Sequence, residues 1–435
     1  MIKEIGTSKV LSLLNNPEAV LLDVRPIAAY NGWKLYDENR GGHISGAKSL
    51  PLRWLQYMDW IEVLDEKNIV PDKPLVVYGY EIDDALKMGK ELVKLGYDQV
   101  FVYHKFLEEW SARNSLPMER LANYRKLVYP EWVKQLINGE NPPGFDGHDF
   151  VICHSHYGFI EDYHKGHIPG AVALDTNSLE STETWNRRSP EELKQALLKL
   201  GIRVDTTVVV YGRFSAPMYT EEKFPGKSAG HLGALRCAAI MLYAGVKDVK
   251  VLNGGMTRWE DENMECTTES ETPVPADHFG AEIPVHPEYM VDLPEAKELL
   301  ASDVGELVSI RSWKEFIGEE SGYHYIEHKG RISGAVFGNC GTDAYHMENY
   351  RNFDHTMREY REVAENWREA GITPDKHIAF YCGTGWRGSE AFINAYLMDW
   401  PTISIYDGGW YEWCTNPENP VEIGSDVEPV IESKE

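Results

Sequence analysis

The chain has 435 residues, of which 43 % are hydrophobic and 11 % aromatic, and its formal net charge is −26. This length corresponds to roughly three domains of ~150 residues, and the apolar content is ample for packed cores. A strongly negative field repels phosphate backbones and anionic lipids, so we expect neither nucleic-acid binding nor membrane binding.

The first residues, MIKEIGTSKVLSLLNN, are too polar for a secretory signal peptide, and no apolar run approaches the ~18 residues of a membrane span. The six cysteines are sparse and form no CxxC pair, which disfavours a disulfide framework and a structural zinc site. We therefore predict a cytoplasmic protein that needs no cofactor and no metal.

One set of three landmarks recurs three times along the chain, which indicates an internal repeat. Each set contains a short loop motif, then an apolar strand with a sharp end, and then a second strand followed by a tryptophan. The copies are HISGA (43–47), LVVYG (75–79) and VFVYHKFLEEW (100–110); HIPGA (167–171), VVVYG (208–212) and VKVLNGGMTRW (249–259); RISGA (331–335), IAFYC (378–382) and ISIYDGGWYEW (403–413).

Amphipathic helical patterns such as 191–202 and 361–372 separate the apolar strands. This alternation predicts an α/β fold in which each copy forms a parallel sheet covered by helices on both faces. Ligands of such sheets bind beyond the carboxyl ends of the strands, where Gly79, Gly212 and Cys382 stand. The landmarks and the proline-rich stretch between copies predict these segments: domains 1–120, 124–265 and 288–424, a linker 266–287, and an acidic tail 425–435.

The second copy is longer than the others, because the interval from Gly212 to Trp259 exceeds that from Cys382 to Trp413 by 16 residues. The extra residues fall in RFSAPMYTEEKFPGKSAGH, 213–231, which has a loop composition. Two interpretations of this segment remain open: a tolerated surface insertion, and a lid or wall for a neighbouring site.

The same copy is rich in histidines, and His154 and His156 would share one strand face, which could suit a metal site. His167 instead belongs to the repeat landmark, so we favour structural roles.

The stretch CGTGWRGSE, 382–390, follows a strand and precedes a helix expected to begin near Ser389. Its three glycines permit backbone angles that turn successive N–H groups inward to form an anion-binding nest. The helix N-terminus and the charge of Arg387 would add to it, and such settings favour a reactive thiolate at Cys382. The first copy has GYEIDDA at this place and the second GRFSAPM, so only the third copy carries the loop.

These motifs resemble the rhodanese family of sulfurtransferases, in which HIPGA precedes a strand ending in CGxGxR. YDGGWYEW is similar to the closing motif of tandem-domain thiosulfate and 3-mercaptopyruvate sulfurtransferases, and three-domain members carry CGTGWR in their last domain. The resemblance implies three rhodanese-like domains, of which the third is catalytic, the second forms part of its pocket wall, and the first is a degenerate structural or docking unit.

Membership would imply that Cys382 accepts a sulfane sulfur from a small-molecule donor, thiosulfate or 3-mercaptopyruvate. A thiol, cyanide or protein-thiol acceptor would then remove the sulfur from the persulfide. Thr384 stands where the 3-mercaptopyruvate enzymes carry a serine. The groups expected to hold the outer sulfur are the backbone N–H groups of Gly383, Thr384, Gly385, Trp386 and Arg387.

One departure leaves the donor open, because Glu315 stands where thiosulfate-type enzymes carry a second arginine, and Lys314 is the nearest cation. We interpret Arg311 as a structural ion-pair partner. In the segment 337–352, Asp343, His346 and Arg351 could line the mouth of the site or belong to an ordinary loop, and Cys340 could relay a persulfide. Trp386, inside the loop, could be exposed and shape access.

The leading prediction is therefore a thiosulfate sulfurtransferase-type enzyme. A sulfur carrier or scaffold is the first alternative, because two of the three copies lack a nucleophile. A cysteine phosphatase or arsenate reductase is the second, although those enzymes place five residues between cysteine and arginine, whereas four lie between Cys382 and Arg387.

Overall fold

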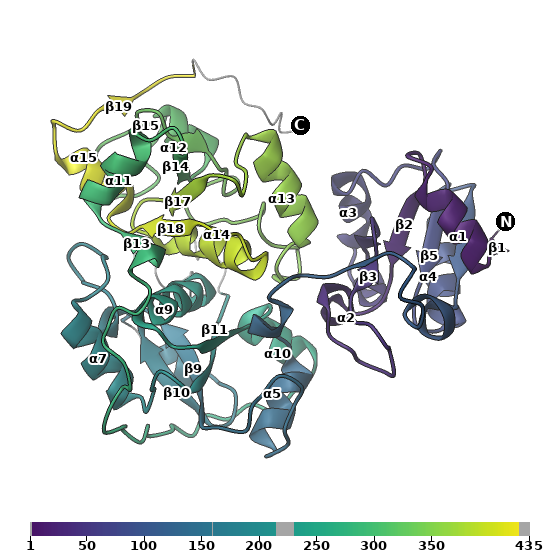
Figure 1. Ribbon diagram of the computed structural model, residues 1–435, viewed down its shortest axis with the longest axis horizontal. Coiled ribbons are helices and arrows are strands. Elements are labelled where there is room, and N and C mark those ends of the chain that lie inside the picture. The colour runs from purple at the N-terminus through teal and green to yellow at the C-terminus, as the bar shows by residue number, and fades with distance from the viewer. Residues whose placement is uncertain (1, 159, 215–229, 426–435) are drawn as a thin grey trace. The chain divides into compact units, whose positions relative to one another are not determined.

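The computed structural model describes residues 2–158, 160–214 and 230–425, and it contains three five-stranded parallel sheets with the same strand topology. The chain divides into two compact units, Met1–Arg125 and Lys126–Glu435, with one sheet in the first unit and two in the second (Figure 1). Among the described residues, no helix is long and apolar enough to cross a membrane.

The first unit has the sheet order β1-β6-β5-β2-β4, and all its neighbouring strands are parallel. The strands are β1 (Lys3–Glu4), β2 (Val20–Asp23), β4 (Lys48–Ser49), β5 (Leu75–Tyr78) and β6 (Val100–Tyr103). The main helices are α1 (Thr7–Leu14), α2 (Ile27–Asn31), α3 (Trp60–Glu66) and α4 (Ile82–Lys94), and β3 (His43–Ile44) pairs antiparallel with β7 (Met118–Glu119).

The second sheet has the order β10-β9-β11-β12-β8. Its strands are β8 (Leu127–Val128), β9 (Phe150–His156), β10 (Ala171–Asp175), β11 (Thr207–Gly212) and β12 (Asp248–Leu252). The helices around it are α5 (Pro130–Ile137), α6 (Glu161–His164), α7 (Pro190–Lys199), α9 (Gly230–Ala244) and α10 (Gly255–Asp261).

The third sheet has the order β13-β18-β17-β14-β16. Its strands are β13 (Met290–Val291), β14 (Gly305–Ser309), β16 (Val336–Phe337), β17 (His377–Tyr381) and β18 (Ile403–Tyr406). The helices are α11 (Leu293–Leu300), α12 (Trp313–Ile317), α13 (Tyr360–Glu369), α14 (Trp386–Leu397) and α15 (Gly409–Thr415), and β15 (Arg331–Ile332) pairs antiparallel with β19 (Val421–Glu422).

The central strands β5, β11 and β17 are almost wholly buried, as expected for parallel strands with both faces covered. This confirms the predicted α/β class. Their ends place Gly79, Gly212 and Cys382 at equivalent positions beyond the sheet. The domain boundaries remain predictions, and most of the predicted insertion at 213–231 lies outside the described residues.

The landmark histidines have a structural role. His43 and His167 each stack on a tyrosine of the preceding helix, with ring centroids 3.7 and 3.6 Å apart. The Nδ1 atom of each ring also lies 2.8 Å from the carbonyl oxygen of the same tyrosine. In the third copy Arg331 takes this place, and its guanidinium lies 4.7 Å from the ring centroid of Phe316.

In the first two copies, a tyrosine near the end of the central strand ties the landmark loop to the sheet. The hydroxyl of Tyr78 accepts the backbone N–H of Ile44 at 3.0 Å, and that of Tyr211 accepts the N–H of Ile168 at 2.9 Å. In the first and second copies, one stacking contact and one hydrogen bond therefore fix the landmark loop.

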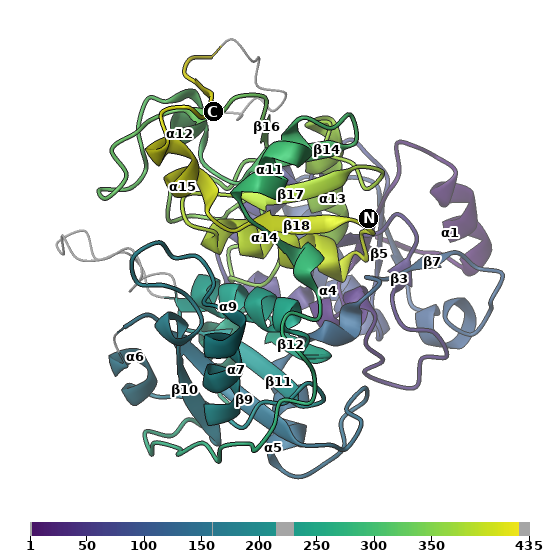
Figure 2. The ribbon, with the colours of Figure 1, turned by 60° about the vertical axis from the view of Figure 1, so that its left-hand side comes forward.

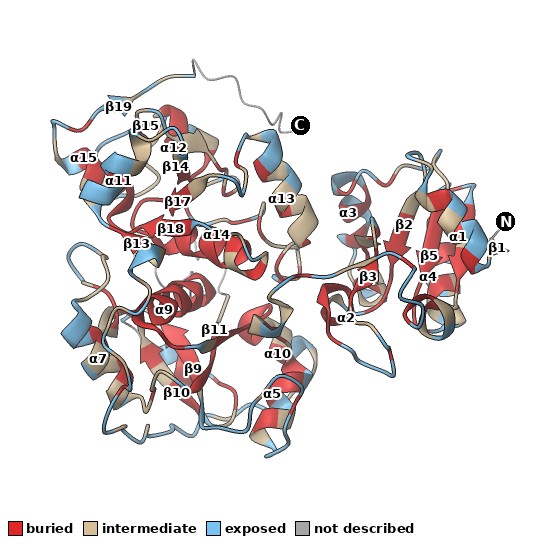
Figure 3. Cartoon of the chain, viewed as in Figure 1, coloured by how far each residue is buried: buried red, intermediate tan, exposed pale blue. Residues whose placement is uncertain are grey.

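Helix α9 joins the second domain to the third, because it packs against its own sheet on one side and against α14 on the other (Figure 2). It is buried along its whole length (Figure 3). A helix that is apolar on nearly every side must be covered all round, and GHLGALRCAAIMLYA has that composition apart from His231 and Arg236. The contact between α9 and α14 brings the second domain to the end of the cysteine loop.

Tyr78→Phe tests the tie between strand and landmark loop. The change leaves the Ile44 N–H buried without its acceptor, which costs about 1–3 kcal/mol. We expect amide exchange across residues 43–47 to accelerate by about 10-fold or more in hydrogen-exchange mass spectrometry. Tyr36→Phe, which alters a tyrosine that is 65 % exposed, is the control and should leave this exchange unchanged.

Candidate active site

Cys382 is the first residue after β17, and its side chain is buried. The loop ends at Gly385, whose φ of +93° suits glycine, and α14 begins at Trp386, three residues before the position expected. The N–H and the hydroxyl of Ser389 both donate to the Gly385 carbonyl, at 2.9 and 2.8 Å. The loop is therefore a tight turn that leads directly into a helix N-terminus.

The first turn of α15 holds the carbonyl groups of the loop. The N–H of Trp410 donates to the Cys382 carbonyl at 2.8 Å, and the N–H of Tyr411 donates to the Gly383 carbonyl at 3.0 Å. A Cβ on Gly409 would lie 2.7 and 2.8 Å from these two oxygens, so only glycine permits the approach. The YDGGWYEW motif is thus the clamp of the cysteine loop.

This clamp determines where the N–H groups of the loop point. The N–H of a trans peptide points away from its carbonyl, so the amides of Gly383 and Thr384 face away from α15. Among the hydrogen bonds of the described residues, none is donated by the backbone N–H groups of residues 383–387. The loop therefore offers five unengaged N–H donors at the positive end of α14, an arrangement that binds anions.

Arg387 is paired with a buried carboxylate rather than presented to the cradle as a free charge. Its two terminal nitrogens donate to the two oxygens of Glu315, each at 2.8 Å, and Arg311 donates to Glu315 at 3.3 Å. Burial by itself raises the pKa of Glu315, but the charges and hydrogen bonds of both arginines outweigh it and lower that pKa to about 2. The sequence predicted the charge of Arg387 at the loop but not this buried partner, and two arginines that share one carboxylate keep one net positive charge.

Arg311 serves the scaffold, as its interpretation as a structural ion-pair partner required. Its guanidinium donates to the Gly330 carbonyl at 2.6 Å and lies 5.1 Å from the ring centroid of Trp410. Arg25 makes the corresponding bond to the Gly42 carbonyl at 2.7 Å in the first domain, which has no cysteine loop. Lys314 is exposed to solvent.

Tyr323 covers the loop. A Cβ on Gly383 would lie 2.2 Å from a carbon of the Tyr323 ring, so the ring packs directly on this glycine. Its hydroxyl accepts from Arg387 at 2.7 Å, and burial raises the pKa of Tyr323 well above its ordinary value. Tyr345, 37 % exposed, meets Tyr323 edge to face at a centroid distance of 6.3 Å. Tyr323 therefore contacts both Arg387 and Gly383, and the partly exposed ring of Tyr345 packs next to it.

The second domain completes this aromatic cover with Trp185. Its ring stacks on Tyr325 with centroids 4.7 Å apart and meets Tyr411 edge to face at 5.4 Å. Trp185 and the tyrosines of the third domain therefore form one aromatic cluster above the cysteine loop.

Trp386 is buried, not exposed. Its indole N–H lies 2.9 and 3.0 Å from the two carboxylate oxygens of Glu180, and its ring packs on α9, where a Cβ on Gly233 would be 3.4 Å away. Burial raises the pKa of Glu180 to about 7, against the opposing charge of Arg236. Sequence alone did not reveal this environment, because Glu180 and α9 belong to the second domain.

The segment 337–352 contributes neighbours of Arg387. Cys340 is buried, its Sγ lies 3.0 Å from a nitrogen of Arg387, and burial raises the pKa of this thiol to about 12. A thiol that stays protonated is a poor nucleophile, which argues against a persulfide relay. The carboxylate of Asp343 pairs with His346 at 2.7 Å, and Arg351 pairs with Glu390 of α14 at 2.7 Å.

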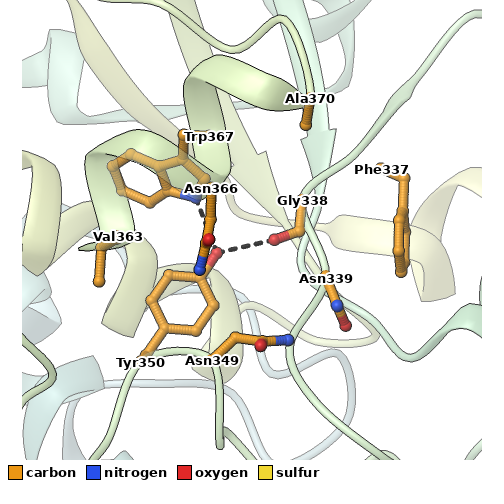
Figure 4. A pocket seen from close by; sticks show the side chains of 9 residues that line it. All are labelled: Phe337, Gly338, Asn339, Asn349, Tyr350, Val363, Asn366, Trp367 and Ala370. Atoms are coloured by element: carbon orange, nitrogen blue, oxygen red, sulfur yellow. Dashed lines mark hydrogen bonds between the residues drawn. The ribbon is translucent and has the colours of Figure 1, made fainter. Parts of the chain in front are cut away.

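Two other candidate regions contain no residue of the cysteine loop. The strand histidines His154 and His156 are buried, and burial lowers the pKa of His154 to about 3, so its ring is neutral. A small cavity beside α13 is lined by aromatic and amide side chains, among which Tyr350 donates to the Gly338 carbonyl and accepts from Trp367, each at 2.9 Å (Figure 4). Its lining holds no cysteine and no carboxylate.

An ionic network at the domain interface was missed by sequence reasoning. Arg236 of α9 contacts Glu180 at 3.2 Å and Asp407 of the third domain at 2.5 Å. A usable signal was present, because Arg236 is a lone charge in an otherwise apolar helix, and such a charge is buried only with a partner.

Comparison with known proteins identifies the repeat. The family described as "Rhodanese-like domain" matches residues 7–113, 130–262 and 292–416, which confirms the three predicted rhodanese-like domains. The chain is 39 % identical to thiosulfate sulfurtransferase YnjE of Escherichia coli over 97 % of this chain and 93 % of that protein. It is 29 % identical to sulfur carrier protein TtuD of Thermus thermophilus over 61 % of this chain and 88 % of that protein.

Solved structures of EanB are also similar to this chain, with 51 % sequence identity. The wild-type EanB structure superimposes with a TM-score of 0.96 and covers 98 % of each chain. Another EanB structure, described as a cysteine persulfide in a tetrahedral intermediate state with ergothioneine, has a TM-score of 0.95 and covers 97 % of this chain and 100 % of that one.

Glu315→Gln tests the buried pair under the loop. Removing the carboxylate charge leaves Arg387 and Arg311 uncompensated, which destabilises the protein by about 3–5 kcal/mol at pH 7. Because the folded-state pKa of Glu315 is depressed, its contribution is full above its unfolded value near 4.5 and is lost as the pH falls toward 2. Urea unfolding of both forms should therefore show a difference that shrinks from pH 5 downward. A constant difference would contradict this role, and the exposed Glu319→Gln is the control.

Proposed function

The chain belongs to the rhodanese family of sulfurtransferases, and on that premise we propose that it moves a sulfane sulfur through a persulfide on Cys382. The observation that carries the proposal is the set of unengaged N–H groups at residues 383–387 beside the only cysteine that ends a central strand. A persulfide anion is a single large sulfur with spread charge, and a small ring of N–H donors suits it.

The first half of the reaction loads the cysteine. With thiosulfate as donor, the Cys382 thiolate attacks the outer sulfur, a new S–S bond forms, and sulfite leaves with the electron pair of the old bond. The N–H groups of Gly383 and Thr384, which α15 turns away from itself, would stabilise the negative charge on the outer sulfur. No step requires a metal or an external redox partner.

The second half of the reaction restores the sulfur-free form of Cys382. A thiolate or cyanide attacks the outer sulfur, the S–S bond breaks, and its electron pair returns to Cys382 as thiolate. We propose thiosulfate or 3-mercaptopyruvate as the donor, with the Thr384 hydroxyl as the group that orients it. Similarity to YnjE supports thiosulfate.

Intact-mass measurement tests the persulfide directly. Incubation with thiosulfate, and separately with 3-mercaptopyruvate, should add the mass of one sulfur atom, and Cys382→Ser should abolish the gain. Cys340→Ser is the matched control, since a buried neutral thiol should not be loaded. Absence of loading by both donors, or loading of the Cys382→Ser form, would contradict the proposal.

The same assay separates the alternatives. An enzyme releases thiocyanate repeatedly when cyanide and thiosulfate are both present, whereas a carrier stops after one equivalent without its partner protein. Similarity to the sulfur carrier protein TtuD supports the carrier as the alternative. Hydrolysis of aryl phosphates or reduction of arsenate would instead point to the phosphatase-type chemistry that the four-residue spacing disfavours.

A second acceptor class is an imidazole betaine. EanB structures are described with hercynine and with ergothioneine, two molecules that differ by one sulfur at C2 of the imidazole ring. In this chain the aromatic cluster above the loop offers ring faces, which attract quaternary ammonium groups. The members of that cluster are Trp185, Tyr323, Tyr325, Tyr345 and Tyr411.

The transfer to such a betaine balances without another reactant. The outer sulfur of the persulfide bonds to C2, the S–S bond breaks, and the proton lost from C2 converts the Cys382 thiolate to a thiol. Carbon C2 is oxidised by two electrons, and the sulfane sulfur is reduced by two.

Loaded enzyme mixed with hercynine should therefore yield ergothioneine and lose one sulfur from its mass. Tyr345→Leu, which removes the exposed edge of the cluster, should raise the KM for hercynine by about 5-fold, because a cation–π contact at a partly exposed ring contributes about 1 kcal/mol. The same variant should retain its KM for cyanide, which has no cation. An equal change in KM for hercynine and for cyanide would show that the aromatic cluster does not recognise the betaine. Tyr36→Leu, at an exposed tyrosine, is the control.

A further inference from the structure

We propose that Arg236 of the second domain is a positioning residue for the cysteine loop of the third domain, and that it holds the loop in its sulfur-binding conformation. This inference rests on the proposed function of the loop. It gives the second domain, which has no nucleophile at the equivalent strand end, a defined part in the reaction.

The first link runs through Asp407. Arg236 Nη2 donates to Asp407 Oδ1 at 2.5 Å, and the other oxygen of Asp407 accepts the backbone N–H and Nη1 of Arg187 at 2.8 and 2.9 Å. Asp407 lies at the entry to α15, three residues before Trp410, which donates to the Cys382 carbonyl. Arg236 therefore anchors the residue that leads into the clamp.

The second link runs through Glu180 and Trp386. Arg236 Nε donates to Glu180 at 3.2 Å, and the same carboxylate accepts the indole N–H of Trp386. Trp386 is the residue at which α14 begins, so this link fixes the opposite end of the loop. One guanidinium thus connects the entry to α15 with the start of α14.

The third link is direct. Arg236 is wholly buried, and its Nη1 has no hydrogen-bond partner among the described residues. A Cβ on Gly385 would lie 3.0 Å from this atom, so the guanidinium lies over the backbone of the loop at the glycine that needs a positive φ. A side chain at Gly385 would be strained at this positive φ and would crowd the guanidinium.

The network is built to keep this charge in place. The pKa of Asp407 is lowered because Arg236 and Arg187 outweigh the effect of its burial, so Asp407 is ionised at neutral pH. Arg187 also pairs with Asp292 at 2.7 Å, which extends the network to the residue before α11. A contact needed only to join two domains would not have to reach both ends of the cysteine loop.

The test compares Arg236→Met, which keeps an apolar stem, with Arg236→Lys, which keeps the charge without the planar fork. We expect Arg236→Met to lower kcat for sulfur loading by about 100-fold, as small misplacements of a reacting group do, with KM for thiosulfate changed less than 3-fold. Arg236→Lys should recover part of kcat. The exposed Lys199→Met of the same domain is the control and should behave as the parent protein.

A second readout does not depend on sulfur transfer. Alkylation of Cys382 by iodoacetamide, followed by peptide mass spectrometry, should slow by about 10-fold in Arg236→Met, since the rate depends on how the loop presents the sulfur. If the parent is never loaded with sulfur yet this alkylation slows, the proposed function fails and the positioning role stands. Parent-like kcat and parent-like alkylation in a folded Arg236→Met protein would overturn the positioning role.

Asp407→Asn covers the case in which Arg236→Met does not fold. The amide keeps the shape and one acceptor but weakens the hold of Arg236 on the entry to α15. It should slow loading and alkylation together by about 10-fold. Unchanged rates in folded Asp407→Asn would count against the proposal.

Discussion

Two backbone hydrogen bonds, donated by Trp410 and Tyr411 to the carbonyls of Cys382 and Gly383, decide what the cysteine loop can bind. With both carbonyls turned toward α15, the paired N–H groups must turn the other way. Gly409 permits the close approach, because any Cβ there would collide with both oxygens. The anion cradle is therefore a consequence of a motif more than twenty residues downstream, and Asp407 and its arginines hold that motif in place.

The charge of the site comes from backbone dipoles rather than from a free side chain. Arg387 and Arg311 share the buried carboxylate of Glu315, so this cluster has one net positive charge, and both terminal nitrogens of Arg387 face the carboxylate. Dipoles at a helix N-terminus suit a singly charged sulfur. Binding of a phosphoryl dianion requires an arginine that donates to its oxygens. Both terminal nitrogens of Arg387 already donate to Glu315.

The three domains share a scaffold but not a site. Tyr78 and Tyr211 make the same hydrogen bond to the landmark loop, and Arg25 and Arg311 make the same bond to a glycine carbonyl. These contacts stabilise the fold whether or not a cysteine ends the central strand. The loop chemistry could therefore be absent from two copies without loss of the fold, because function belongs to the site and not to the architecture.

The sequence by itself determined the repeat, the α/β class and the place of the cysteine loop, because strand periodicity and glycine spacing are local properties of the chain. It also placed Glu315 as a departure and Arg311 as a structural partner. Only the tertiary structure decided that Arg387 is neutralised by Glu315 and that Trp386 is buried. It alone brought Arg236 and Glu180 to the loop, which begins 146 residues after Arg236 along the chain. Burial and ion pairing depend on which surfaces pack together, and here α9 of one domain packs against α14 of the next.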